Sequence, residues 1–274
     1  MSTSEPIRPP RRSATRYVRR VMTKPDQPFL LDTLRAEIHG IGVLAAPADP
    51  DLPVPACPGW TAGALVRHLG GVAHRVTAWV DSQTLPLEWE REPPAGQDVL
   101  GWFRAASDGL FRSLASRPPS FPCQTWFPAD RTYGFWRRRM AHEFTVHRVD
   151  LEQALGLPPV VDPALAADGV DEVLTVWLAE GNRPAPEETV SVDASGEVFE
   201  VRCAGRVWTV RMPSGTGNPV VRPVSADSAD GRVSGAPEDV YLWLWGRGPA
   251  DPLAVTGDVS GLRAALAAVT RYAA

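Results

Sequence analysis

The chain has 274 residues, of which 44% are hydrophobic and 22% charged, and its formal net charge at pH 7 is −4. These fractions are typical of a soluble globular protein, and the length favours two hydrophobic cores over one. No apolar run approaches the length of a membrane span, and no basic-then-apolar leader is present, so we expect a cytoplasmic protein with no membrane partner.

Composition changes along the chain. Residues 1–24 contain seven Lys or Arg residues against a single acidic residue, Glu5. Adjacent prolines and arginines there indicate disorder, so residues 1–26 are expected to form a disordered basic tail, either a dispensable arm or an extension upstream of a start at Met22. Because the rest of the chain is acidic, it lacks the basic face that phosphate binding needs. We therefore expect no nucleic-acid partner.

Apolar residues at helical spacing predict four helices between residues 27 and 160. Prolines end the first and third helices, and Thr61 is expected to cap the second. The proline- and aromatic-rich segment 119–128 precedes the fourth helix and either closes over a site or packs as a surface loop. The positions that mark the helices are Leu30, Leu34, Ile38 and Ile41, then Leu65, Leu69, Val72 and Val76, then Val99, Phe103, Ala106, Leu110 and Leu114, with the fourth helix expected from about Phe135 to Leu155.

A possible metal site lies on two of these helices. Glu143 and His147 are four residues apart, which places a carboxylate and an imidazole on one helix face about one turn apart. His68 lies within the apolar stripe of the second helix, and an inward polar ring needs a partner. Two histidines and a carboxylate are a catalytic zinc set with an open fourth position. Asp150 shares the face of His147 and is a candidate hydrogen-bond acceptor for an imidazole. The alternative is a surface pair or a capped polar group in the core.

The cysteines exclude two other kinds of site. Cys57, Cys123 and Cys203 are an odd number of widely spaced residues with no Cys-x-x-Cys pair. This pattern argues against a disulfide framework and against a thiolate zinc finger. Cys57 allows two interpretations, a nucleophile or a small buried residue in a Pro-Gly turn, and the second is the more common.

In the second half of the chain, the spacing of apolar residues changes from a helical repeat to alternation. Prolines near residues 158–163 mark the expected domain boundary. Residues 27–160 then form the bundle, and residues 161–274 form a smaller α+β domain. Alternation across residues 189–210 predicts two or three antiparallel strands. The expected elements are a helix from Asp162 to Leu178, those strands with a turn at Ala204-Gly205, a short strand after the connection at 212–223, a helix from Pro237 and a last helix from Leu262 to Tyr272.

Several sequence blocks occur in a defined order: Pro-Ala-Cys-Pro-Gly-Trp-Thr (55–61) with His-Leu-Gly-Gly (68–71), His-Glu-x-x-x-His-Arg-x-Asp (142–150), Ser-Gly-Ala-Pro-Glu-Asp-Val-Tyr-Leu-Trp-Leu-Trp-Gly-Arg (234–247) and Val-Thr-Gly-Asp (255–258). From about Phe29 to the C-terminus, the chain resembles the actinobacterial mycothiol-dependent maleylpyruvate isomerase family. The resemblance implies an N-terminal DinB-like four-helix bundle that holds one zinc through His68, Glu143 and His147. It also implies a smaller C-terminal α+β domain similar to sterol-carrier proteins.

Trp243, Trp245 and Arg247 can each be interpreted in two ways. Trp243 and Trp245 lie in an aromatic-rich helix and are more often core residues than a ligand site. In the resembling family, the arginine that matches Arg247 reaches the cleft between the domains. A guanidinium there can bind a substrate carboxylate through two hydrogen bonds. The alternative is a surface arginine beside the C-terminus of a helix.

The resemblance also implies the activity and the cofactors, zinc and mycothiol. The metal favours the thiolate form of mycothiol. In an isomerisation, this thiolate adds to the double bond of a cis-enoyl diacid, the resulting single bond rotates, and the thiolate leaves. In a transfer, the thiolate attacks an electrophile and stays attached to it. We therefore expect a monomeric zinc-dependent enzyme whose partners are this thiol and a small, carboxylate-bearing substrate, with Asp150 and Arg247 as catalytic residues. The alternatives are a thiol-independent zinc hydrolase and a non-catalytic module that binds metal and an apolar ligand.

Overall fold

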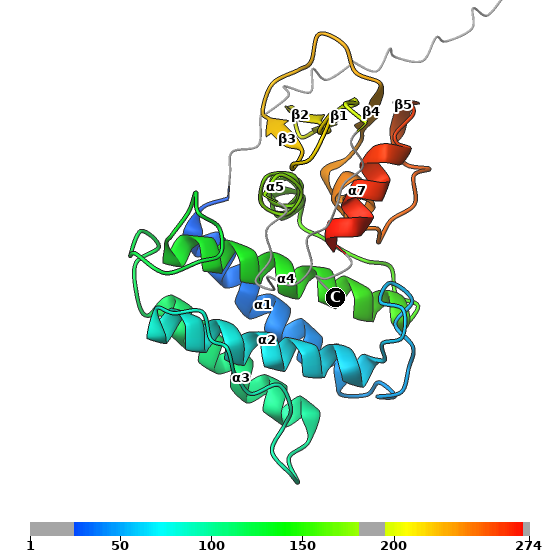
Figure 1. Ribbon diagram of the computed structural model, residues 1–274. Coiled ribbons are helices and arrows are strands. Elements are labelled where there is room, and N and C mark those ends of the chain that lie inside the picture. Colours follow the sequence, from blue (N-terminus) through cyan, green and yellow to red (C-terminus); the bar gives the residue numbers. More distant parts are fainter. Residues whose placement is uncertain (1–24, 181–194, 271–274) are drawn as a thin grey trace, which may run out of the picture.

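The computed structural model describes residues 25–180 and 195–270 and has an α+β architecture (Figure 1). The bundle consists of α1 (Gln27–Ala45), α2 (Ala62–Ser82), α3 (Val99–Ala115) and α4 (Tyr133–Ala154), which confirms the four predicted helices. No helix within the described ranges is long and apolar enough to cross a membrane. The basic tail expected at residues 1–26 lies almost entirely outside the described residues.

Each bundle helix begins at an aspartate or a threonine. The side chains of Asp26, Thr61, Asp98 and Thr132 each accept a hydrogen bond from a backbone N–H group of the first turn. These oxygens satisfy donors that the start of a helix leaves unpaired, and so they fix where each helix begins. The predicted cap at Thr61 is confirmed, and it sets the position of His68 on α2.

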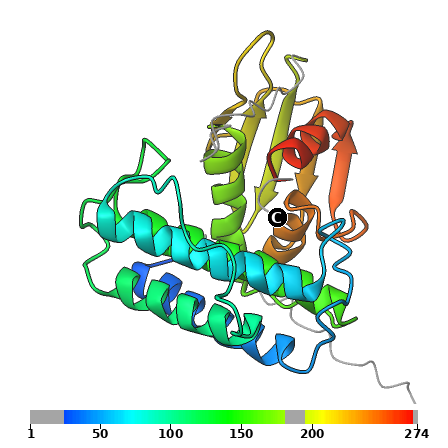
Figure 2. The same ribbon diagram turned by 60° about the horizontal axis from the view of Figure 1, so that its bottom comes forward.

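Helix α4 lies between the rest of the bundle and the second half of the chain (Figures 1 and 2). It is therefore buried on nearly all sides, including its polar residues His142, Glu143, His147 and Asp150. Polar groups that lose contact with water are costly unless they find partners within the protein. Helix α4 is consequently the element where interactions among polar side chains are concentrated.

The described part of the second half contains a five-stranded sheet with strand order β3-β2-β1-β4-β5. Strands β1 and β2 form an antiparallel hairpin, whose two-residue turn holds Ala204 and Gly205 at φ values of 50° and 77°. Positive φ at both positions is characteristic of the turn type that matches strand twist. Figure 2 shows the helices of this half on one face of the sheet. The elements are α5 (Pro163–Glu172), β1 (Val198–Cys203), β2 (Arg206–Arg211), β3 (Val220–Arg222), β4 (Gly231–Ser234), α6 (Pro237–Leu244), β5 (Ala254–Gly257) and α7 (Ser260–Thr270).

The predicted antiparallel hairpin is confirmed, and the sheet also contains a parallel pair whose direction was not predicted. Strand β1 pairs with β4 in parallel, with Phe199 opposite Gly231 and Val201 opposite Val233. Strand β3 lies within the connection expected at 212–223 and was not predicted. Strand β5 was not predicted either, because all four of its residues are exposed and no alternation marks it. The helix expected to reach Leu178 does so, but α5 passes into a π-helical segment, Val173–Leu178. Part of the strand region expected from residue 189, and the end of the last helix, lie outside the described residues.

Helix α2 packs closely on α3 at Gly70. A methyl group at this position would lie 2.2 Å from Cζ3 of Trp102, so the buried Trp102 ring or the helices themselves would have to shift. We expect Gly70→Ala to lower the free energy of unfolding by about 1–3 kcal/mol. Gly109→Ala on α3 is the matched control, because its methyl group would meet no described atom within 4 Å apart from its chain neighbours and the nearby backbone of its own helix. It should raise that free energy by up to about 1 kcal/mol through helix propensity. Urea unfolding measures both values, and equal changes would contradict the close packing.

Candidate metal centre

The three predicted ligands lie together where α2 faces α4. Nε2 of His68 is 3.3 Å from Oε1 of Glu143, and Nε2 of His147 is 3.6 Å from the same oxygen. One ligand atom from each residue lies within 4.8 Å of the others. Two ligands that are each about 2.1 Å from a tetrahedral zinc are roughly 3.4 Å apart, so the separations fit one ion. The donor set also fits, because two imidazoles and a carboxylate leave a fourth position for a small molecule.

A carboxylate orients the His147 ring. Nδ1 of His147 is 2.9 Å from Oδ2 of Asp150, which is fully buried. An ionised carboxylate only accepts hydrogen bonds, so Nδ1 carries the proton and Nε2 is the nitrogen that faces Glu143. Hydrogen-bonded carboxylates hold metal-binding histidines in this way in many proteins. Asp150 therefore orients the ring of His147 and lies outside the group formed by His68, Glu143 and His147.

Arg247, from the second half of the chain, is bound to Asp150. Its Nε lies 2.8 Å from Oδ1 of Asp150, and its Nη2 lies 3.1 Å from Oδ2. Nη1 donates to the carbonyl oxygen of Trp245 at 2.7 Å. The side chain is only 6% exposed, so Arg247 is a buried residue and its guanidinium has a carboxylate partner inside the protein.

Cys57 completes this cluster. Its thiol donates to Oδ2 of Asp150 at 3.4 Å, and Nη2 of Arg247 lies 3.6 Å from its sulfur. The residue is buried in the turn before α2, as the commoner interpretation of the sequence expected. It also belongs to a second group of potential ligand atoms, with His147 and Asp150. The network thus joins the turn before α2, helix α4 and the segment after α6.

Glu143 is held from its other side by Arg139. Nη2 of Arg139 donates to Oε2 of Glu143 at 2.6 Å, while Nη1 donates to Glu172 at 2.5 Å. Oε1 of Glu143 is thereby left facing the two histidines. Burial alone would raise the pKa of Glu143, but hydrogen bonds from His147 and His68 and the charge of Arg139 keep it well below its usual range. The carboxylate is therefore ionised, as a metal ligand must be.

The two histidines differ in their preference for a proton. Burial lowers the pKa of His68 and outweighs its hydrogen bond to Glu143, so this ring is neutral. Burial alone would also lower the pKa of His147, but hydrogen bonds with Asp150, Cys57 and Glu143 raise it well above its usual value. A metal ion held by Nε2 of His147 would have to displace the proton on that nitrogen. Binding of such an ion would therefore release a proton and would strengthen as the pH rises.

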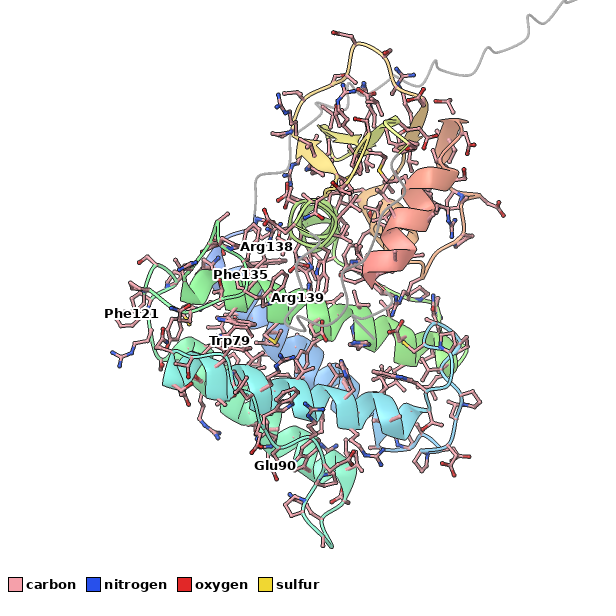
Figure 3. All side chains as sticks on the ribbon, viewed as in Figure 1. Trp79, Glu90, Phe121, Phe135, Arg138 and Arg139 are labelled. Atoms are coloured by element: carbon pink, nitrogen blue, oxygen red, sulfur yellow. The ribbon has the colours of Figure 1, made fainter. Side chains whose placement is uncertain are left out.

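A small cavity borders His68 and Glu143. Its volume is about 130 Å³, and tryptophans from four segments line it. They are Trp79 of α2, which is labelled in Figure 3, Trp126 of residues 119–128, Trp136 of α4 and Trp177 of the π-helical segment. Arg139, labelled in the same view, also borders this space. We call it the tryptophan cavity. The aromatic segment between α3 and α4 therefore lies at the site.

Two larger cavities lie on either side of Trp60. One, of about 380 Å³, borders His68 and is lined by Arg67, Arg75 and Arg91; we call it the arginine cavity. The other, of about 480 Å³, separates the turn before α2 from α6 and α7 and borders Cys57 and Arg247. We call this space the interdomain cavity. The indole of Trp60 packs on both imidazoles, with ring centroids 4.9 Å from His68 and 6.2 Å from His147.

Comparison with known families agrees with the sequence blocks. Residues 31–152 match the model of the mycothiol maleylpyruvate isomerase N-terminal domain, and residues 164–266 match the model of the MDMPI C-terminal domain. The chain belongs to the mycothiol-dependent maleylpyruvate isomerase family. Membership places it in a family of enzymes and confirms the resemblance stated from the sequence.

Solved structures of this family share the fold of the chain. A crystal structure of the mycothiol-dependent maleylpyruvate isomerase aligns with a TM-score of 0.57 at 14% identity, covering 86% of this chain and 96% of that one. A crystal structure of a histidine-to-alanine mutant of that enzyme gives the same values. Comparison with curated proteins finds no match. The structural likeness therefore supports the fold of this chain. Arguments about its chemistry depend on the residues of this chain itself.

Sequence reasoning did not find every residue of the cluster. Arg139 was missed, although it precedes Glu143 by four residues and so lies on the same helix face. Cys57 was considered only as an isolated residue, and its place in the Pro-Ala-Cys-Pro-Gly-Trp-Thr block of the maleylpyruvate isomerase family was the available signal. His142, in the same motif as Glu143, is directed away from the three ligands, with Nε2 3.0 Å from Oδ2 of Asp168.

Proposed function

We propose that the chain is a zinc-dependent enzyme that uses mycothiol to isomerise, or to transfer the thiol to, a small carboxylate-bearing electrophile. The convergence of His68, Glu143 and His147 beside the tryptophan and arginine cavities carries this proposal. Family membership supports the choice of thiol, because the models that match are those of mycothiol-dependent maleylpyruvate isomerase domains. The mixed nitrogen and oxygen donor set favours zinc over magnesium or calcium.

Each residue of the centre has a defined task in this proposal. His68, Glu143 and His147 would hold the ion, and a bound divalent metal lowers the pKa of a thiol at its open position. Arg139 fixes the orientation of Glu143, with Nη2 2.6 Å from Oε2. Asp150 fixes the ring of His147, with Oδ2 2.9 Å from Nδ1. Pre-oriented ligands avoid reorganisation during the reaction.

The two candidate reactions share their first step. A thiolate attacks one carbon of an activated double bond, and the electron pair of that bond moves onto the adjacent carbonyl group. In isomerisation, the remaining single bond rotates and the thiolate leaves, so no atom is gained or lost. In transfer, a proton is added to the substrate and the sulfur stays attached. Both reactions need an acceptor pocket beside the thiol, and the tryptophan and arginine cavities border His68 as such a pocket would.

Asp150 and Arg247 are proposed as positioning residues. Both guanidinium nitrogens that face Asp150 are engaged by its carboxylate, and Nη1 is engaged by the carbonyl oxygen of Trp245. A role for Arg247 in binding substrate would require giving up one of these bonds. Its geometry supports a different contribution, in which Arg247 holds Asp150 and Asp150 holds His147.

Calorimetry with mycothiol tests the proposed function. We expect mycothiol to bind the zinc-loaded protein and to bind the metal-free protein and His147→Ala far more weakly, because the charge that stabilises the thiolate is lost. His74→Ala is the matched control, since His74 lies on α2 but pairs with Glu90 at 3.5 Å. Equal affinity with and without metal would contradict the thiol mechanism and favour the hydrolase alternative.

A further inference from the structure

Arg75 lies on the same face of α2 as His68. Seven residues separate the two, which corresponds to about two helical turns and roughly 10 Å between their Cα atoms. The side chain of Arg75 is half-buried and borders both the tryptophan cavity and the arginine cavity. His68 also borders both spaces. A molecule held in either cavity can therefore lie beside both His68 and Arg75.

Arg75 has no carboxylate partner among residues 25–180 and 195–270. Its Nε is buried without a hydrogen bond to the described chain. The guanidinium instead packs on tryptophan rings, with its Cζ 4.3 Å from the centroid of Trp89 and 6.0 Å from that of Trp79. Indole faces stabilise a cation only modestly compared with a desolvated carboxylate. The hydrogen-bonding edge of Arg75 is thus left for a ligand.

A second arginine adds positive charge at the same place. Cζ of Arg91 lies 3.8 Å from the centroid of Trp89, so two guanidinium groups pack on one indole. The acidic neighbours of Arg91 are engaged elsewhere, Glu90 with His74 at 3.5 Å and Glu92 with Arg67 at 2.9 Å. Burial, and then the charge of Arg91, lower the pKa of Arg75. An anion bound in the arginine cavity, which both residues line, would offset this positive charge.

The other arginines beside the centre are already paired. Arg139 binds Glu143 and Glu172, and Arg247 binds Asp150. We propose that Arg75, assisted by Arg91, binds a carboxylate of the acceptor substrate and makes the site selective for anionic electrophiles. This inference rests on the proposed function for the reaction, but the anion site is defined by the arginines alone. Arg75, rather than Arg247, is then the residue that determines specificity for acids.

Succinate is a suitable probe, because it carries two carboxylates and has no double bond for a thiolate to attack. Calorimetry on the zinc-loaded protein should show succinate binding, and Arg75→Gln should weaken it roughly 10- to 100-fold, the range for losing a charge-assisted pair. Arg75→Lys should retain part of the affinity, since the charge remains but the fork geometry is lost. Succinamide, of similar shape but uncharged, should bind wild type and Arg75→Gln equally weakly.

Arg67→Gln is the matched control. Arg67 lines the same arginine cavity but is paired with Glu92, so its loss should change succinate affinity less than about threefold. Equal losses for Arg67→Gln and Arg75→Gln, or no succinate binding by wild type, would overturn the proposal. Mycothiol affinity should be the same in Arg75→Gln and wild type. If mycothiol fails to bind wild type while the succinate results hold, the thiol mechanism fails and the anion site stands.

Discussion

His68→Ala and His147→Ala should each reduce the metal content of freshly purified protein from about one equivalent per chain to a trace. Each variant removes one of three protein ligands, whereas loss of a supporting hydrogen bond typically weakens a metal site about 10- to 100-fold. Loss of a ligand itself should therefore exceed that range. Elemental analysis by mass spectrometry measures the content directly, and competition with a coloured chelator gives the affinity.

His74→Ala provides the control for this prediction. His74 lies on α2 like His68, pairs with Glu90 and stacks on Trp102 with ring centroids 5.2 Å apart. Because it is outside the three ligands, His74→Ala should keep the metal content of wild type. If His68→Ala and His147→Ala also keep it, the assignment of the ligands is wrong.

Asp150→Asn should lower the free energy of unfolding by about 3 kcal/mol or more. The substitution preserves shape but removes the charge that pairs with Arg247, and breaking a buried ion pair on one side leaves an uncompensated charge. Urea unfolding of the metal-free protein measures this effect without a contribution from bound metal. Glu92→Gln is the comparison, because it breaks an exposed pair in which the side chain of Glu92 is 70% exposed and that of Arg67 is 40% exposed. This substitution should lower the free energy of unfolding by less than about 1 kcal/mol.

A double variant separates the pair from other effects of the substitution. Asp150→Asn combined with Arg247→Gln removes both charges, so the combined loss should be clearly smaller than the sum of the single losses. Strict additivity would show that the two residues do not stabilise each other. Metal affinity should also fall about 10- to 100-fold in Asp150→Asn, because His147 loses the carboxylate that orients it.

The same pair defines a pH dependence of stability. Burial alone would raise the pKa of Asp150, but hydrogen bonds from His147 and Arg247 lower it from 3.8 to about 2. A carboxylate whose folded-state pKa is depressed stabilises the fold above its unfolded-state pKa. The contribution of Asp150 should therefore be complete above about pH 4, and it should be lost as the pH falls through the folded-state value of about 2. In Asp150→Asn, this part of the acid sensitivity should be absent.

The bundle and the meeting of His68, Glu143 and His147 could be predicted because the signals are local. Apolar residues recur with the period of a helix, prolines interrupt it, and Glu143 and His147 are one turn apart. The prediction for His68 depended on one argument, that a polar ring within the apolar stripe of a helix faces inward and needs a partner there. These inferences depend on spacing within one helix at a time.

The rest of the site depends on contacts between distant parts of the chain. Cys57 and Asp150 are 93 residues apart, and Arg247 and Asp150 are 97 apart. No periodicity connects such residues, so Arg247 could be interpreted as a surface residue and Cys57 as an isolated one. The parallel pairing of β1 with β4 has the same cause, because β2 and β3 lie between them in the chain.

X-ray absorption at the zinc edge, recorded with and without mycothiol, tests the central claim most directly. Without mycothiol, the account predicts only nitrogen and oxygen neighbours at about 2.0–2.2 Å, from His68, Glu143, His147 and solvent. With mycothiol, one sulfur neighbour at about 2.3 Å should be added. A spectrum that stays free of sulfur after mycothiol is added would contradict the thiol mechanism. A sulfur neighbour already present without mycothiol would contradict the ligand assignment and point to Cys57.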